Sequence, residues 1–292
     1  MDSENELNDN LNDAAEEAQE SFNPNSFIGT LSVAVVLCLV CSLVVSVAAV
    51  ALRPIQQRNQ ENKMKRNVLI AAGLWDPKTS TDQDIPEMFK SIETVAVNLP
   101  GRAEDAPIPG TLNEETDLNT YNQVKAAKDP DRSVFIANDN VDDIAGIKRR
   151  EVVGLAYLVN DSSGKLESVV VPIYGKGLWS TLYGYIALDA DCRTVRGITF
   201  YQHGETPGLG GEVDNPKWKA QWVGKEIVSA DGVPDLKVTK PGNATKDNQV
   251  DGLSGATITS SGVERTVRYW LGEDAYGPFL DRIREESVAV VQ

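Results

Sequence analysis

The sequence predicts an α+β protein in which one N-terminal transmembrane helix is followed by a single domain with an antiparallel sheet and packed helices. The first observation is an uncharged apolar segment at residues 27–52. The second is a series of short β-branched and aromatic runs separated by turn residues, which is typical of consecutive antiparallel strands. The third is a late apolar stripe with helical spacing, which predicts a helix packed on that sheet.

Composition narrows the class of protein. The chain has 292 residues, with 28 basic and 43 acidic side chains and a net charge of −15. This balance excludes a typical nucleic-acid-binding protein, which needs clustered Lys and Arg to neutralise phosphates. The length fits one globular domain of about 200 residues with extensions.

The N-terminal part divides into two segments. Residues 1–26 are acidic and poor in large apolar side chains, which predicts a disordered, solvated tail. At about 1.5 Å per helical residue, residues 27–52 exceed the roughly 30 Å hydrocarbon core of a bilayer and are predicted to span it. A cleaved signal peptide is the alternative, but its basic n-region is missing and the apolar run is longer than an h-region.

The charges beside this helix bear on its orientation. Basic residues follow the helix directly, namely Arg53, Arg58, Lys63, Lys65 and Arg66. The positive-inside rule would therefore place residues 53–292 in the cytoplasm. The rule weakens for a long following domain, so the charges alone leave the orientation open.

Cysteine and histidine are scarce. Cys38 and Cys41 share one helix face, where they would either ligate a metal with another subunit or pack as small apolar residues. Cys192 is alone in the polar part, which therefore has no internal disulfide. His203 is the single histidine, which argues against His-rich metal sites and Ser-His-Asp hydrolysis. We predict no metal site and no catalytic residue.

The polar part is divided by pattern. Residues 53–140 are predicted to form a membrane-proximal segment and the first part of the soluble domain, with helical character at 66–75 and an irregular stretch near 98–132. Residues 141–280 contain the strands and the late helix, and residues 281–292 form a C-terminal tail. The predicted strands are 152–159, 168–174, 181–189 and 195–203. The residues of the helical stripe are Val263, Val267, Trp270 and Leu271.

A turn rich in hydroxyl side chains precedes this stripe. Ser261 and Glu264 match a capping box, which predicts that the helix begins there. Thr257 would then lie in the glycine-containing turn that leads into the helix, where free backbone N–H groups and the helix dipole stabilise a phosphate. Asp251 lies upstream, where it would hold a metal or orient a hydroxyl. An ordinary loop has the same composition and is the alternative.

Four stretches of the sequence resemble one known family. They are DGLSGAT at 251–257, HGETPGLG at 203–210, GKGLWS at 175–180 and KMKRNVLIAAGL at 63–74. Together they are similar to the FMN-binding domain family of the C subunit of the sodium-translocating NADH:quinone reductase, which shares its first motifs with the G subunit of the Rnf complex. The similarity extends from about residue 27 to 275 and favours the former, because the Rnf protein is shorter between helix and domain.

The resemblance implies that FMN is attached covalently, through its phosphate, to the hydroxyl of Thr257. It implies that Glu205 and Thr206 hydrogen-bond the ribityl chain or ring edge and that Leu209 covers a ring face. Gly208 and Gly210 would allow close approach and positive φ. His203 would anchor its loop or border the flavin, and Trp179 would lie near the ring or be a core aromatic. The full predicted cofactor site is Thr257, Ser254, Gly255, Ala256, Asp251, Glu205, Thr206, Gly208, Leu209, His203, Leu178 and Trp179.

The resemblance also implies a function. Such a subunit takes electrons from an iron–sulfur centre among its partner subunits and passes them to another flavin, in a complex that pumps sodium while it reduces ubiquinone. The chain is not expected to oxidise NADH alone, because no strand leads into a GxGxxG turn. The family places its flavin domain on the extracytoplasmic face of the bacterial inner membrane, where a flavinyltransferase attaches the FMN. The alternatives are a protein like the Rnf G subunit or another membrane-anchored covalent flavoprotein serving a different reductase, and a binding module without flavin.

Overall fold

The structure, a computed structural model, describes residues 26–101, 106–136 and 143–289. The chain divides into two compact units, Met1–Glu61 and Asn62–Gln292. Almost all of the predicted acidic tail lies outside the described residues.

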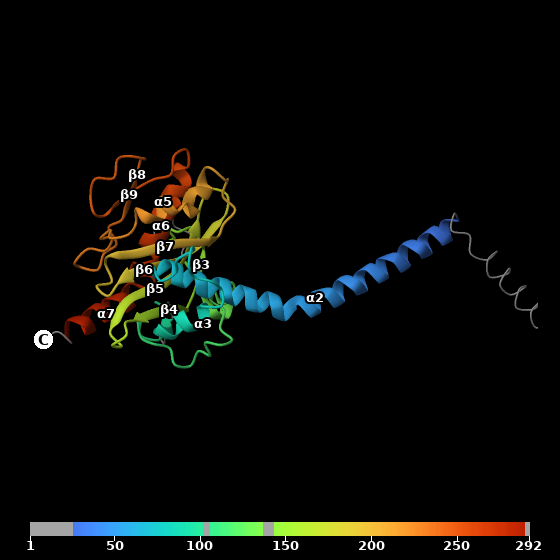
Figure 1. The fold of residues 1–292 in the computed structure, drawn as a ribbon, viewed down its shortest axis with the longest axis horizontal. Coiled ribbons are helices and arrows are strands. Elements are labelled where there is room, and N and C mark those ends of the chain that lie inside the picture. The colour runs from blue at the N-terminus through green and yellow to red at the C-terminus, as the bar shows by residue number, and fades with distance from the viewer. Residues whose placement is uncertain (1–25, 102–105, 137–142, 290–292) are drawn as a thin grey trace, which may run out of the picture. The chain divides into compact units, whose positions relative to one another are not determined.

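The first unit contains most of helix α2, Phe27–Ala71, which begins where the uncharged segment begins (Figure 1). Among the described residues it is the one helix that is long and apolar enough to cross a membrane. It continues beyond residue 52, through Pro54, because the charged segment that follows is rich in good helix formers. The helical character predicted for residues 66–75 is confirmed as far as Ala71.

The second unit is built on a five-stranded antiparallel sheet with the strand order β1-β4-β5-β6-β7. The four predicted strands are confirmed within two residues at each end. The first strand in the chain was not predicted, and it pairs along its whole length with β4. The strands are β1 Ile92–Asn98, β4 Val153–Asn160, β5 Leu166–Lys176, β6 Thr181–Asp189 and β7 Val195–Gln202.

Short elements and two helices complete this unit. The short strands form an antiparallel pair, β2 with β3, and a parallel pair, β8 with β9. The remaining elements are α3 Ile85–Met88, η1 Phe89–Ser91, α4 Gln123–Ala126, η2 Pro130–Arg132, β2 Ser133–Phe135, β3 Arg149–Glu151, η3 Gly210–Asp214, α5 Pro216–Ala220, β8 Lys237–Thr239, β9 Gln249–Asp251, α6 Thr257–Trp270 and α7 Gly277–Ala289.

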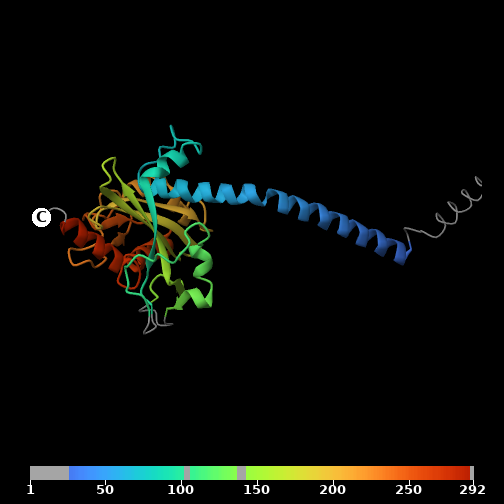
Figure 2. The same cartoon turned by 90° about the horizontal axis from the view of Figure 1, so that it is seen from below.

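Both faces of the sheet are buried. Val169 and Val171 of β5 belong to the larger hydrophobic cluster, which includes α6 and α7. Val170 points to the opposite face, where residues of the last turns of α2 and Tyr157 complete a smaller cluster. Figure 2 shows the last turns of α2 against the sheet. This alternation follows from the two-residue period of a strand. The predicted stripe of α6 is confirmed, because Val263, Val267 and Trp270 are fully buried, as is nearly all of Leu271.

Two predicted boundaries divide parts of the chain that fold together. The sheet takes β1 from the segment 53–140 and its other strands from residues 141–280, so the division at residue 140 runs through one folding unit. The expected tail at 281–292 begins within α7, which continues to Ala289. Ile283 is buried there and packs in the larger cluster, which ties this helix to the core.

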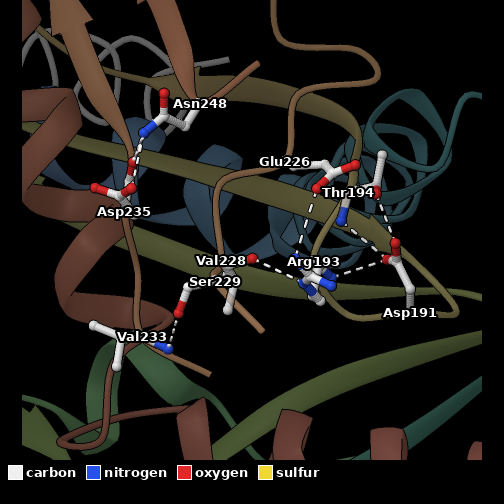
Figure 3. A network of polar contacts seen from close by, with 9 residues as sticks. All are labelled: Asp191, Arg193, Thr194, Glu226, Val228, Ser229, Val233, Asp235 and Asn248. Atoms are coloured by element: carbon white, nitrogen blue, oxygen red, sulfur yellow. Dashed lines mark hydrogen bonds and ion pairs between the residues drawn. The ribbon is translucent and has the colours of Figure 1, made fainter. Parts of the chain in front are cut away.

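A polar network anchors the long segment that leads from β7 toward α6 (Figure 3). Arg193, in the β6–β7 turn, donates to the carbonyl of Val228 at 3.0 Å and pairs with Glu226 at 3.6 Å. The carboxylate of Asp191 closes the turn by accepting from the backbone and hydroxyl of Thr194. The segment therefore pairs with the start of the edge strand β7, at Val195.

Candidate functional site

Helix α6 begins at Thr257, four residues before the predicted start. Ala256 occupies the N-cap position and provides no side-chain cap. The capping-box prediction for Ser261 and Glu264 is wrong, because both residues lie inside the helix and a Glu264 carboxylate oxygen accepts from the backbone N–H of Val238 at 2.7 Å. The first turn of α6 therefore leaves backbone N–H groups without a side-chain partner.

The turn before helix α6 is stabilised by a hydrogen bond to a side chain of the helix. Ser254 and Gly255 form a turn, and Gly255 has φ +71°, a conformation that favours glycine. The hydroxyl of Ser260 accepts from the N–H of Leu253 at 2.9 Å, so Ser260 rather than Ser261 ties the turn to the helix.

Asp251 orders its own neighbourhood. Its Oδ1 accepts from the backbone N–H groups of Asn243 at 2.9 Å and Ala244 at 2.8 Å. Its carbonyl accepts from the indole of Trp218 at 2.8 Å. The carboxylate thus folds the segment between β8 and β9. Within the described ranges, no group of three or more His, Cys, Asp or Glu side chains is placed to hold a metal ion.

Glu205 joins the motifs at 175–180 and 203–210 to the start of α6. Its carboxylate accepts from the backbone N–H groups of Trp179 at 2.9 Å, Ser180 at 3.1 Å and Leu178 at 3.3 Å. It also accepts from the hydroxyl of Thr259, in the first turn of α6, at 2.6 Å. The loop after β5, the loop after β7 and the start of α6 therefore meet at one buried carboxylate, a role that the sequence did not reveal.

The charge of this carboxylate is stabilised by its donors. Burial raises the pKa of Glu205, but hydrogen bonds from Thr259 and the three amides outweigh burial and hold the pKa below its usual value. Glu205 is therefore a carboxylate at neutral pH. An anionic acceptor strengthens each of the four bonds, which fixes the loop of Leu178 and Trp179 against α6.

His203 anchors the second loop. Its Nδ1 accepts from the N–H of Glu205 at 3.2 Å, and its Nε2 lies 2.9 Å from a carboxylate oxygen of Asp214. These two partners require the tautomer with the proton on Nε2. Its ring is thus engaged on both sides, which agrees with the anchoring role predicted from the sequence.

The structure requires glycine at positions 208 and 210 of this loop for different reasons. Gly208 has φ +76°, as predicted, whereas Gly210 does not have positive φ. A Cβ at Gly210 would lie 2.6 Å from the Thr259 hydroxyl and 2.7 Å from the Glu205 carboxylate, so close approach excludes a side chain. The carbonyl of Thr206 closes the turn by accepting from the N–H groups of Leu209 and Gly211.

Four large apolar side chains on these motifs or directly after them are exposed. Trp179 is 67% exposed, which excludes the alternative that it is a core aromatic. Ile258, which follows Thr257 and was not predicted, is 55% exposed, and Leu178 and Leu209 are 42% and 44% exposed. A Cβ at Gly255 would lie 3.0 Å from a methyl group of Leu209, so two of the motifs are in contact here as well. Exposed apolar groups gathered on buried polar supports are typical of a ligand or partner site.

The two threonines at the start of α6 differ in access. Thr257 is exposed, whereas Thr259 is 1% exposed and donates its hydroxyl to Glu205. The hydroxyl that is accessible to a reagent or an enzyme is that of Thr257.

The arrangement defines a class of protein, a membrane-anchor helix followed by a flavin-type domain, and comparison with known proteins agrees. Residues 177–272 match the FMN-binding domain model. The Na(+)-translocating NADH-quinone reductase C subunit of Pseudomonas aeruginosa is 46% identical over 268 residues, which cover 90% of this chain and 98% of that protein. The corresponding C subunit of Yersinia pestis is 43% identical over 267 residues, which cover 91% and 96%.

A solved structure agrees with these relatives. The crystal structure of Shewanella oneidensis NqrC aligns with a TM-score of 0.69 and 33% identity, over 78% of this chain and 99% of that one. The chain belongs to the family of the Na(+)-translocating NADH-quinone reductase C subunit, NqrC, and it is a subunit of such a complex. Its N-terminal apolar helix fits a single-pass anchor in a membrane complex.

Proposed function

We propose that this subunit holds FMN through a phosphoester to Thr257 and relays electrons from an iron–sulfur centre in a partner subunit to another flavin. The observation that carries this proposal is the exposed hydroxyl of Thr257 at the uncapped start of α6, with Thr259 buried beside it. The linkage makes the chain a phosphoprotein.

The residues around Thr257 fit an FMN that is attached through its phosphate. The first turn of α6 offers backbone N–H groups and the positive end of the helix dipole to the phosphate. Gly255, with positive φ, lets the chain turn before Thr257. The exposed apolar side chains of Leu178, Trp179 and Leu209 offer cover for a flat ring.

When bound, FMN supplies the redox chemistry, and the chain's own residues do the rest. Glu205 keeps the loop of Leu178 and Trp179 docked on α6, and His203 fixes the loop that carries Leu209. Ile258 lies next to the attachment residue and adds apolar surface. Because these supports are rigid, the site remains assembled through repeated electron transfer. The subunit does not oxidise NADH on its own.

The linkage is tested by flavin fluorescence of the protein after denaturing electrophoresis. We expect the wild-type band to fluoresce when the protein is made with the flavinyltransferase, and the Thr257→Val band to be dark. The matched control is Thr259→Val, which we expect to fluoresce because its hydroxyl is not accessible. A dark wild-type band, or fluorescence in Thr257→Val, would refute the attachment at this residue.

We further propose that the flavin domain lies on the extracytoplasmic face of the bacterial inner membrane, where the flavinyltransferase acts. Cys192 is unsuitable for a labelling test because it is fully buried, which raises the pKa of its thiol to about 12. Ser162, in the exposed β4–β5 turn, is suitable. We expect Ser162→Cys to react with a membrane-impermeant maleimide in intact cells, with the wild type as the control. Labelling that requires lysis would place the domain in the cytoplasm.

A further inference from the structure

A second site lies beside the flavin motifs, where β3, α4 and the β5–β6 hairpin meet. It is a pocket of about 360 Å³, a size that accepts a small ligand or a few inserted side chains. Tyr174 and Tyr183 form part of its wall, with ring centroids 5.6 Å apart and ring planes 26° from parallel. These two tyrosines lie on the strands whose connecting loop carries Leu178 and Trp179.

The charged residues that line this pocket are all basic: Lys128, Lys148 and Arg149. Within the described part of the chain, neither lysine side chain has an ion-pair partner. Arg149 donates to neutral acceptors, the hydroxyl and carbonyl of Ser133 and the carbonyl of Pro130. Three cations without an ion-pair partner among the described residues are thus gathered on a chain whose net charge is −15.

The backbone that presents Lys148 is held in an unusual conformation. Lys148 has φ +64°, a left-handed conformation that a non-glycine residue keeps only where the surroundings enforce it. The carboxylate of Asp143 enforces it by accepting from the N–H groups of Ile147 at 2.8 Å and Lys148 at 2.7 Å. The cation at the pocket is therefore presented by a rigid turn, which lowers the entropy that binding would cost.

We propose that this pocket receives an acidic segment of a partner subunit of the complex. Tyrosine and arginine are the residues that most often form the centre of a protein–protein interface, and a pocket between them accepts an anchoring side chain. Carboxylates of the partner would compensate the lysines at the rim, which fixes the register of the contact. Because Thr181 lines the pocket and the adjacent Ser180 donates its N–H to Glu205, a segment seated here lies near the proposed flavin site.

The first test uses the purified complex and a zero-length carbodiimide, which joins a lysine amine to a carboxylate in direct contact, with loss of water. We expect mass spectrometry to find Lys128 or Lys148 joined to an Asp or Glu of a partner subunit, and the yield to fall at high salt. Cross-links from these lysines only within this chain or to a second copy of it, or none, would overturn the proposal.

The second test measures assembly. We expect the double variant Lys128→Glu, Lys148→Glu to lose partner subunits during affinity purification at moderate salt. The matched control, Lys78→Glu with Lys165→Glu, makes the same charge change at exposed lysines outside the pocket and is expected to retain them. Covalent flavin fluorescence in both variants reports that each domain is folded and that the site at Thr257 is independent of this one. Equal retention of partners by the two variants would overturn the proposal.

Discussion

Two buried glutamates of this domain have opposite electrostatic character. Glu151, on β3, is fully buried, and Glu205, after β7, is 5% exposed. The pKa of Glu151 lies above its usual value, whereas that of Glu205 lies below. Burial by itself therefore does not decide whether a carboxyl group in this protein is charged.

The balance between the depth of burial and the donors decides it. Burial raises the pKa of Glu151, and two side-chain donors, the hydroxyl of Tyr174 at 2.6 Å and the amide of Gln123 at 2.5 Å, do not offset it. Glu205 receives four donors, three of which are backbone N–H groups. A carboxylate that accepts several such bonds is stabilised in its charged form, and this stabilisation exceeds the cost of its burial.

The difference corresponds to different tasks. Glu151 joins α4, β3 and β5 inside the core, where Gln123 also accepts from the N–H of Leu155. Glu205 joins the loop after β5 and its own loop after β7 to the first turn of α6. A charged acceptor is suited to ordering loops, because each bond to it is stronger than a bond between neutral groups.

The largest effect is expected from Glu205→Gln. The amide removes the negative charge and turns one acceptor atom into a donor that faces the existing donors. We expect a loss of about 2–4 kcal/mol in the free energy of unfolding, measured with urea at pH 7, together with reduced covalent flavin. Because burial raises the pKa of Glu151, its charged form is disfavoured, and the matched change Glu151→Gln should cost less than about 1 kcal/mol. Equal losses in the two variants would contradict the distinction.

The second effect is in the pH dependence of stability. Because the folded-state pKa of Glu205 is lowered, its contribution is present above the unfolded value of about 4.3 and is lost as the pH falls through the folded pKa. For Glu151 the folded-state pKa is raised, so its contribution is present below about 4.3 and is lost as the pH rises. We expect the differences in stability between wild type and each Gln variant to slope in opposite directions between pH 3 and 8. Parallel slopes would refute the assignment.

The same comparison explains what could be predicted from the sequence. The stripe of Val263 and Val267 and the four β-rich runs were predicted, because burial imposes a period that is visible locally. The role of Glu205 was not, because three of its partners are backbone groups about 25 residues away, and backbone groups leave no mark on residue identity. Strand β1 was not predicted, because its burial depends on pairing with β4, more than fifty residues later.

The predicted start of helix α6 is wrong for a related reason. Ser261 and Glu264 fit the capping pattern, but the helix begins at Thr257 without a side-chain cap. Local propensity favours a capped start, and the structure instead leaves the first turn open beside Gly255 and Leu209. Departures from local preference are expected where a site is built, and this one coincides with the motif that resembles the flavin attachment sequence.

The smallest effects are expected when each glutamate loses one hydroxyl donor. Thr259→Val removes one of four bonds to Glu205, and Tyr174→Phe removes one of two side-chain bonds to Glu151. Each should cost about 1 kcal/mol in the free energy of unfolding, because a single donor is lost and the side-chain shape is nearly kept.

The dependence of stability on pH should then separate the two variants. In Thr259→Val the Glu205 carboxylate keeps its three amide donors. The stability that is lost as the pH falls should therefore become smaller without disappearing, and the covalent flavin should be retained. In Tyr174→Phe the pKa of Glu151 rises further, so the loss of stability shifts to higher pH. If the free energy of unfolding of Thr259→Val no longer fell at acid pH, the backbone amides would not be the groups that keep Glu205 charged.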